Sequence, residues 1–305
     1  MSAGPQVVVV GSVAFDSIRT PAGARERMLG GSASYSALAA ALTARTGLVG
    51  VVGEDWPEEY WEIYRRAGVD TQGVERGKGK TFYWAAEYDA GMDDRETLAT
   101  ELGAFAEFRP EVPPSYRKAD VLVLGNIAPS LQARVLDQSE AGLTMLDTMN
   151  LWIDTARDEL EAVIRRVDLV TVNEHEAREL TGEASLVRAG RALLSMGPKW
   201  ALVKKGSHGA FLMGRGGERD VLMCPAWPLA EVKDPTGAGD SFAGAFAASV
   251  AQAGGAGRDA FREALAWATV VAARTCGEFG VDALAGADVE SLRRDRAAFA
   301  EMVAR

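Results

Sequence analysis

The stretch that decides the fold is Lys233-Asp234-Pro235-Thr236-Gly237-Ala238-Gly239-Asp240-Ser241-Phe242, which runs directly into the Ala-rich segment 243–250. The small residues predict a tight turn followed by a helix, and the glycines let a ligand approach the main chain closely. The first turn of a helix has free N–H groups and the positive end of the helix dipole, so it can bind an anion such as phosphate. Asp240 lies in that turn. It is either a carboxylate that stabilises the helix start or a general base beside a bound phosphoryl group.

Two better-known phosphate motifs do not fit the sequence. Gly237 and Gly239 match the first two glycines of a dinucleotide-binding turn, but Phe242 occupies the third position, where Gly or Ala is needed. The segment 77–81 imitates the end of a P-loop, yet the earlier glycine of that motif would fall on Val74. We therefore reject both interpretations.

Composition narrows the class of protein. The chain has 305 residues, of which 48% are hydrophobic and 25% charged, the balance of a soluble globular protein. A formal net charge of −10 argues against nucleic-acid or anionic-membrane partners, which need a basic surface. Cys224 and Cys276 are far apart and form no CxxC pair, so we expect neither a disulfide scaffold nor a zinc site, and a cytoplasmic protein. The apolar run 7–10 is too short for a signal or membrane-spanning segment.

Strand and helix patterns alternate along the chain. Continuous apolar runs at 6–11, 48–52, 120–126, 143–147, 168–172 and 200–203 predict buried parallel strands, with periodic helices between them. This alternation predicts a doubly wound α/β fold. We also expect a helix over 33–45 capped by Ser32, an aromatic strand over 81–88, and a mostly exposed segment over 89–119. Asp16 and Asn126 follow strands at the edge where such sheets bind ligands, although each could equally hold a loop.

The segment 234–242 resembles the C-terminal motif of the ribokinase-like (pfkB) carbohydrate kinases. Gly30-Gly31 and Asn173-x-x-Glu176 are similar to two further motifs of that family, and the resemblance spans Asp16 to Gly280. It implies a three-layer α/β/α doubly wound, mostly parallel sheet in one domain, 1–305, with a small β lid built from strands near 17–29 and 78–108. It also implies transfer of the γ-phosphoryl group of ATP to a hydroxymethyl group.

The resemblance further implies roles for individual residues. Asp240 would be the general base, and the N–H groups of the helix start would stabilise the transferred phosphoryl group. Glu176 would hold Mg²⁺ through water, because Mg²⁺ prefers oxygen ligands and keeps much of its hydration shell. Spacing alone instead favours a capping box between Asn173 and Glu176. The complete set comprises the helix-start residues Gly237, Ala238 and Gly239 with Asp240, the acceptor-binding residues Asp16, Gly30, Gly31 and Asn126, and the nucleotide-binding residues Asn173, Lys205, Gly206 and Gly209.

The acceptor stays open at this stage. Ribokinases continue Gly-Gly with Lys-Gly-Ala-Asn, whereas this chain has Ser32-Ala33-Ser34-Tyr35, which argues against ribose. We expect a sugar or sugar-like acceptor. The alternatives are a nucleoside kinase that stacks a base on the aromatics of 82–84, and a non-catalytic sugar-binding regulator, which the intact motif disfavours. The same aromatics could simply pack on both faces of their strand. The resemblance also leaves open a monovalent cation near 276–280 and a homodimer formed through the lid.

Overall fold

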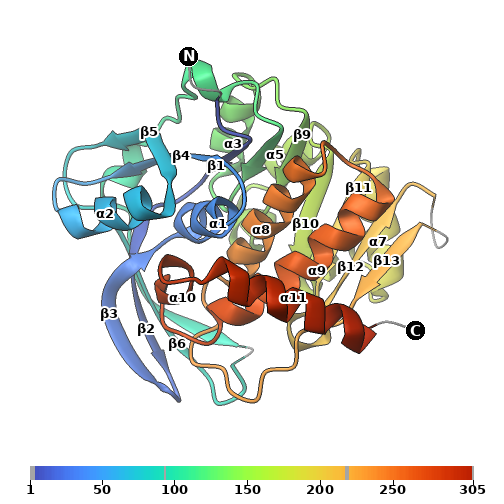
Figure 1. The fold of residues 1–305 in the computed structure, drawn as a ribbon. Coiled ribbons are helices and arrows are strands. Elements are labelled where there is room, and N and C mark those ends of the chain that lie inside the picture. The colour runs from blue at the N-terminus through green and yellow to red at the C-terminus, as the bar shows by residue number, and fades with distance from the viewer. Residues whose placement is uncertain (1–3, 93, 217–219, 304–305) are drawn as a thin grey trace.

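A computed structural model describes residues 4–92, 94–216 and 220–303, and it is built around a nine-stranded sheet (Figure 1). The strand order is β13-β12-β11-β10-β9-β8-β1-β4-β5. Neighbours from β5 to β11 pair in parallel, and β12 and β13 are antiparallel. The strands are β1 Val7–Val10, β4 Thr46–Val52, β5 Val69–Arg76, β8 Val121–Leu124, β9 Leu143–Leu146, β10 Leu169–Asn173, β11 Trp200–Lys204, β12 Ala210–Gly214 and β13 Val221–Cys224.

The sheet is buried on both faces because its strands are apolar on both sides. Val7 and Val9 belong to one core cluster and Val8 and Val10 to the other, as alternation along a strand requires. The first face is covered by α1 Ser32–Ala41, α2 Glu58–Ala67, α8 Ala238–Gln252, α9 Arg258–Thr275, α10 Asp282–Ala285 and α11 Val289–Val303. The second is covered by α3 Pro129–Leu136, α4 Asn150–Thr155, α5 Arg157–Ile164, α6 Glu174–Thr181, α7 Leu186–Ser195 and the short 3₁₀ turns η1 Gly103–Glu107 and η2 Pro114–Tyr116. The predicted three-layer α/β/α architecture is confirmed.

A second, four-stranded sheet stands beside the main one, in the order β3-β2-β6-β7. Its strands are β2 Ala14–Thr20, β3 Gly23–Gly30, β6 Phe82–Tyr88 and β7 Arg95–Glu101. β2 pairs in parallel with β6, and the two outer pairs are antiparallel. Asp16 therefore lies within the second sheet, opposite Trp84 of β6.

Two local expectations were wrong. Ser32 does not cap α1: Gly31 is the N-cap residue with φ 88°, and the Ser32 hydroxyl lies 3.1 Å from that of Ser12 instead. The helix ends at Ala41 rather than near residue 45, because β4 already begins at Thr46.

The segment 89–119 is mostly exposed, as predicted, but it also contains a strand and several core residues. It contributes β7, and its apolar side chains Phe108, Val112, Tyr116 and Ala119 are buried in the second core cluster. Pro110, Pro113 and Pro114 limit the rest of the segment, up to β8, to the short turn η2.

Helices α1 and α8 pack almost backbone to backbone. A Cβ atom at Gly244 would lie 2.0 Å from the carbonyl oxygen of Ser36. The Ser36 hydroxyl in turn donates a 2.8 Å hydrogen bond to the backbone oxygen of Asp240. The first turn of α8 is thereby fixed against α1.

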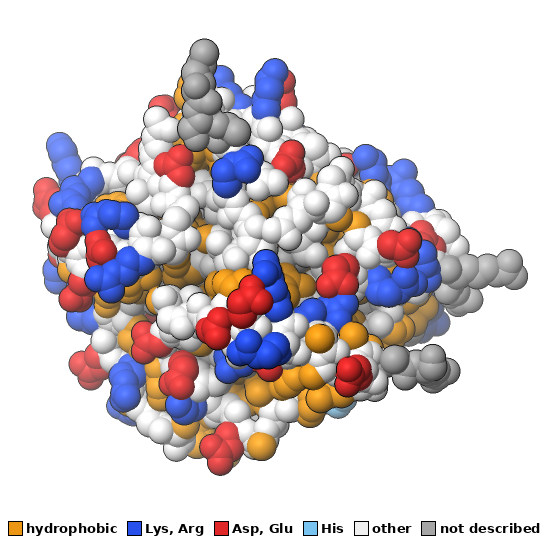
Figure 2. Space-filling view, viewed as in Figure 1, with side chains coloured by type: hydrophobic (Ala, Val, Ile, Leu, Met, Phe, Trp, Pro, Cys, Tyr) orange, Lys and Arg blue, Asp and Glu red, His pale blue; other side chains and the backbone are white. Residues whose placement is uncertain are grey.

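Charges of both signs are interspersed on the face shown in Figure 2. Among the described residues, no helix has the length and apolar character needed to cross a membrane.

Candidate active site

The first turn of α8 lies at the edge of the sheet where the parallel strands end. Gly237 is its N-cap residue and adopts φ 73°, a left-handed conformation that favours glycine. A Cβ atom there would lie 2.3 Å from the Tyr35 ring, so the turn also needs glycine for space. The N–H of Ala238 donates to the carbonyl of Pro235 at 3.2 Å, so this predicted phosphoryl-binding donor is engaged within the turn.

Asp16 approaches this turn from the second sheet. Asp16 is only 3% exposed, and its carboxylate accepts a 3.3 Å hydrogen bond from the N–H of Gly31. A Cβ atom at Gly30 would lie 2.0 Å from the Asp16 carboxylate, so only glycine fits there. Three of the residues predicted from the sequence, Asp16, Gly30 and Gly31, therefore lie in contact with one another.

Asn173 and Glu176 form the capping box that their spacing predicted. The Asn173 side chain accepts from the N–H of Glu176 at 2.9 Å, and the Glu176 carboxylate accepts from the Asn173 N–H at 2.8 Å and from its side-chain amide at 2.7 Å. Glu176 is nevertheless buried, and the charged groups that act on it most strongly are Asp147 and Lys204. One carboxylate thus begins a helix and belongs to a buried charge cluster.

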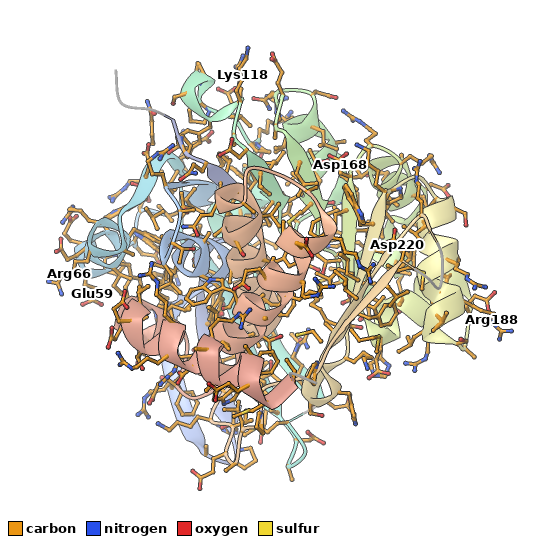
Figure 3. The ribbon with its side chains drawn as sticks, turned by 45° about the vertical axis from the view of Figure 1, so that its right-hand side comes forward. Glu59, Arg66, Lys118, Asp168, Arg188 and Asp220 are labelled. Carbon is orange, nitrogen blue, oxygen red and sulfur yellow. The ribbon has the colours of Figure 1, made fainter. Side chains whose placement is uncertain are left out.

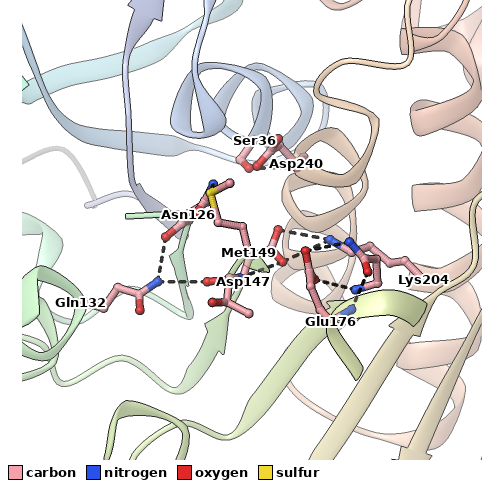
Figure 4. A network of polar contacts seen from close by, with 11 residues as sticks. Ser36, Asn126, Gln132, Asp147, Met149, Glu176, Lys204 and Asp240 are labelled. Carbon is pink, nitrogen blue, oxygen red and sulfur yellow. Dashed lines mark hydrogen bonds and ion pairs between the residues drawn. The ribbon is translucent and has the colours of Figure 1, made fainter. Parts of the chain in front are cut away.

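That cluster contains a lysine that the sequence analysis did not select (Figure 4). Lys204 Nζ lies 3.2 Å from both carboxylate oxygens of Asp147, and a Cβ atom at Gly239 would lie 3.2 Å from Nζ. Burial lowers the pKa of Lys204, but Asp147, Glu176 and Asp240 outweigh it and hold that pKa above its ordinary value. Lys204 is the last residue of strand β11 and Lys205 follows it, and of the two it is Lys204 whose side chain reaches Gly239 of α8.

The remaining predicted residues lie around this charge cluster and make hydrogen bonds within the protein. The Asn126 side chain accepts a 2.8 Å hydrogen bond from the indole N–H of Trp152 and lies 3.0 Å from the sulfur of Met149. The loop predicted to bind the nucleotide is closed by the Lys205 N–H, which donates to the Gly209 carbonyl at 2.7 Å. Gly206 and Gly209 have φ 52° and 82°, which fixes a tight exposed turn after β11.

Burial raises the pKa of three carboxyl groups at this edge to about 7. For Asp240 and Glu176 the charge of Asp147 raises the pKa further and Lys204 opposes the rise. For Asp16 the Gly31 N–H opposes the rise, while Asp234 and Asp240 add to it. By contrast, ionisable side chains such as Glu59, Arg66 and Lys118 lie on the periphery of the molecule (Figure 3). Perturbed carboxyl groups gathered at one edge are typical of an active site.

Within the described part of the chain, no group of three or more His, Cys, Asp or Glu side chains is arranged to hold a metal ion. A cation bound beside Glu176 would need most of its ligands from water or from phosphate, which is how Mg²⁺ usually binds. The residues present therefore fit Mg²⁺ that arrives with a nucleotide.

Comparison with known proteins agrees with the fold. The model of the pfkB family of carbohydrate kinases matches residues 5–284. The chain belongs to this family, and it is an ATP-dependent kinase.

A cytidine kinase from Thermococcus kodakarensis is 32% identical over 249 residues, which cover 79% of this chain and 87% of that protein. A nucleoside kinase from Methanothermobacter thermautotrophicus is 28% identical over 278 residues, covering 81% and 82%. Among solved structures, Burkholderia thailandensis nucleoside kinase in complex with inosine has a TM-score of 0.79 at 19% identity, covering 97% of this chain and 98% of that one. Arabidopsis thaliana ribokinase complexed with ribose and ATP has a TM-score of 0.77 at 24% identity, covering 96% and 99%. These two structures share the fold.

The buried carboxyl groups predict an unusual dependence of stability on pH. A carboxyl whose pKa is raised by folding binds its proton more tightly in the folded state, so stability falls as pH rises from about 4 to about 7. Asp16→Asn should therefore raise the free energy of unfolding at pH 8, by on the order of 1–4 kcal/mol. The gain should shrink steadily towards pH 5.

Urea denaturation of wild type and variant at both pH values measures this effect. Asp259→Asn, which removes a carboxylate that is 96% exposed, is the matched control and should change stability little at either pH. A destabilised Asp16→Asn protein at pH 8 would contradict the prediction.

Proposed function

We propose that this kinase transfers the γ-phosphoryl group of MgATP to the hydroxymethyl group of a nucleoside, with Asp240 as the general base. The observation that carries the proposal is the position of the Asp240 carboxyl, half-buried in the first turn of α8 with a pKa raised to about 7. A base poised near neutral pH is suited to accept a proton from a hydroxyl group. The acceptor oxygen then bonds to the γ-phosphorus, the bond from that phosphorus to the β,γ-bridging oxygen breaks, and ADP leaves.

Each predicted residue has a place in this scheme. The N–H groups of Gly237, Gly239 and Asp240 would stabilise charge on the phosphoryl oxygens. Asp16 with Gly30-Gly31 would position the acceptor. The loop from Lys205 to Gly209, together with Asn173, would bind the nucleotide, and Glu176 would hold Mg²⁺ through water. When bound, Mg²⁺ neutralises phosphate charge.

Two observations favour a nucleoside over a free sugar. The first is the similarity to a cytidine kinase, the stronger of the two nucleoside-kinase matches in sequence. The second is Trp84, a half-buried aromatic paired with Asp16 across the second sheet. A base could stack on Trp84 while its sugar contacts Asp16. Phe82 does not share this role because it stacks on Phe105, and Tyr83 does not because it lies on the face of the strand opposite to Trp84 and Asp16.

The second sheet would act as the lid of the single domain. It contacts the loop before α8 through two hydrogen bonds, from the Thr236 hydroxyl to the Tyr88 hydroxyl at 3.2 Å and from the Thr20 hydroxyl to the Lys233 carbonyl at 2.7 Å. A lid at this place would exclude water, which otherwise competes as phosphoryl acceptor.

The direct test is ADP release from MgATP with cytidine, other nucleosides, ribose and further sugars. We expect a nucleoside to stimulate turnover, with kcat/KM rising as pH increases through about 7. Asp240→Asn should lower kcat by about 10²–10⁴-fold while nucleotide binding is retained, and Asp259→Asn should behave as wild type. Turnover with sugars but not with nucleosides would show that the acceptor is a sugar. An active Asp240→Asn enzyme would refute the role of Asp240 as general base. Exchange of potassium for tetramethylammonium in the same assay tests the monovalent-cation proposal.

We also propose that Lys204 binds the transferred phosphoryl group. In the structure its ammonium is held by Asp147, yet it lies beside Gly239, where the anion-binding turn begins. An incoming phosphate would compete with Asp147 for this buried ammonium, and charge at such a position stabilises the transition state.

Substituting Lys204 alone would leave Asp147 buried without a partner, which destabilises the fold. The double variant Asp147→Asn/Lys204→Met removes both charges and should fold with near-native stability. If Lys204 acts on the phosphoryl group, kcat should still fall by about 10²-fold or more. Near-native kcat in a folded double variant would show that the ion pair is only structural.

The predicted homodimer through the lid remains a proposal. Leu98 of the outer strand β7 is 52% exposed and Leu102, just beyond it, is 48% exposed, which gives this edge an apolar surface for a second copy. Light scattering at micromolar concentration should show a dimer that Leu98→Lys weakens. A wild-type monomer would rule it out.

A further inference from the structure

The side chain of Gln132 joins the ends of two neighbouring strands at the edge of the sheet that carries the site (Figure 4). The pairing of β8 with β9 ends at Leu124 and Leu146, and the Asp147 N–H still donates to the Leu124 carbonyl at 2.8 Å. Beyond that bond, the Gln132 Nε2 group donates to the Gly125 carbonyl at 2.9 Å and to the Asp147 carbonyl at 3.0 Å. One amide of α3 therefore holds the two strands together where their own pairing stops.

This amide is completely buried and only partly satisfied. Gln132 is 0% exposed, and its Oε1 atom has no hydrogen-bond partner among the described residues. A glutamine amide has two N–H donors and one acceptor oxygen. Because both of its neighbours are carbonyl groups, the NH₂ group must face them, and the oxygen is left over. An unpaired buried polar atom costs free energy, and residues that bear such a cost are expected at functional sites.

Asp147 connects this contact to the active site. Its two carboxylate oxygens each lie 3.2 Å from Lys204 Nζ, and one of them also accepts from the Thr148 N–H at 3.1 Å. The ammonium in turn lies beside Gly239 in the first turn of α8. The position of the ammonium thus depends on the main chain of Asp147, and Gln132 is the side chain that holds the carbonyl of that residue.

We propose that Gln132 is a positioning residue for phosphoryl transfer, because it fixes the Asp147 main chain and thereby the carboxylate that places the Lys204 ammonium beside Gly239. A lysine side chain is long and flexible, so its charge needs an anchored partner to occupy one place. A displacement of about 1 Å in such a group can lower the rate by on the order of 10²-fold. This inference rests on the proposed role of Lys204 and deepens it.

A double-mutant cycle tests the proposal. Four proteins are compared by ADP release from MgATP with cytidine, or with ribose if only sugars turn over: wild type, Gln132→Met, Asp147→Asn/Lys204→Met, and the triple variant. Gln132→Met should lower kcat by about 10–100-fold in the otherwise wild-type chain. In the background that lacks the ion pair, the same substitution should change kcat by no more than about twofold, since the group that it positions is gone.

The matched control is Gln138→Met. The Nε2 group of Gln138 also donates to two carbonyls, those of Pro110 at 2.9 Å and Arg134 at 3.0 Å, but Gln138 lies two residues beyond the other end of α3. Its loss should destabilise the fold, as the loss of Gln132 should, and leave kcat within about twofold of wild type in both backgrounds.

Thermal unfolding of each variant identifies a temperature at which every protein is folded, and kcat is compared there. If Gln132→Met does not fold, Gln132→Glu takes its place in the cycle. A protonated carboxyl has a single O–H donor and an ionised one has none, so this variant cannot serve both carbonyls either.

The outcomes separate the two proposals. An equal loss of kcat in both backgrounds would show that Gln132 is merely structural, and it would leave the role of Lys204 intact. A folded Gln132 variant with wild-type kcat would also overturn the inference. If Asp147→Asn/Lys204→Met itself keeps near-native kcat, the proposed role of Lys204 fails, and the role of Gln132 fails with it.

Discussion

The close backbone contact between α1 and α8 is the constraint on which the site depends. Gly244 allows the two helices to approach until the carbonyl of Ser36 fills the space of a side chain, and the Ser36 hydroxyl holds the backbone of Asp240. The start of α1 carries the Gly30-Gly31 turn against Asp16, and the start of α8 carries Asp240. Because the helices cannot slide apart, the groups proposed to bind the acceptor and to take its proton keep a fixed separation, which phosphoryl transfer requires.

A second constraint is the burial of like charges. Asp16, Asp234 and Asp240 lie close enough to affect one another's ionisation. Asp147 and Glu176 lie on the other side of Asp240, and the Lys204 ammonium pairs with Asp147 there. Such an arrangement opposes folding, since each carboxylate disfavours ionisation of the next. Function and stability therefore favour different charge states of the same groups, a trade-off that is common in enzymes.

The sequence was sufficient for the architecture because that information is local and periodic. The apolar runs, the capping pair Asn173 and Glu176, and the glycine turn before α8 each follow from spacing within a few residues. It was not sufficient where packing between distant segments decides. Strand register, and not residue type, points Lys204 rather than Lys205 at α8, and sheet pairing places Trp84 beside Asp16. The engagement of the Ala238 amide by Pro235 likewise depends on how the turn closes.

The capping box at α6 has a consequence for how such chains diverge. Glu176 satisfies the backbone N–H of Asn173 whether or not a nucleotide is ever bound, so its replacement would disturb the helix start in any descendant. A copy of this gene that lost phosphoryl transfer would be expected to retain the residue for folding alone. Glycine at position 239 carries no such second duty, because its φ is ordinary and its nearest outside neighbour is the Lys204 ammonium. Among duplicated copies that have lost kinase activity, we therefore expect Gly239 to be replaced before Glu176.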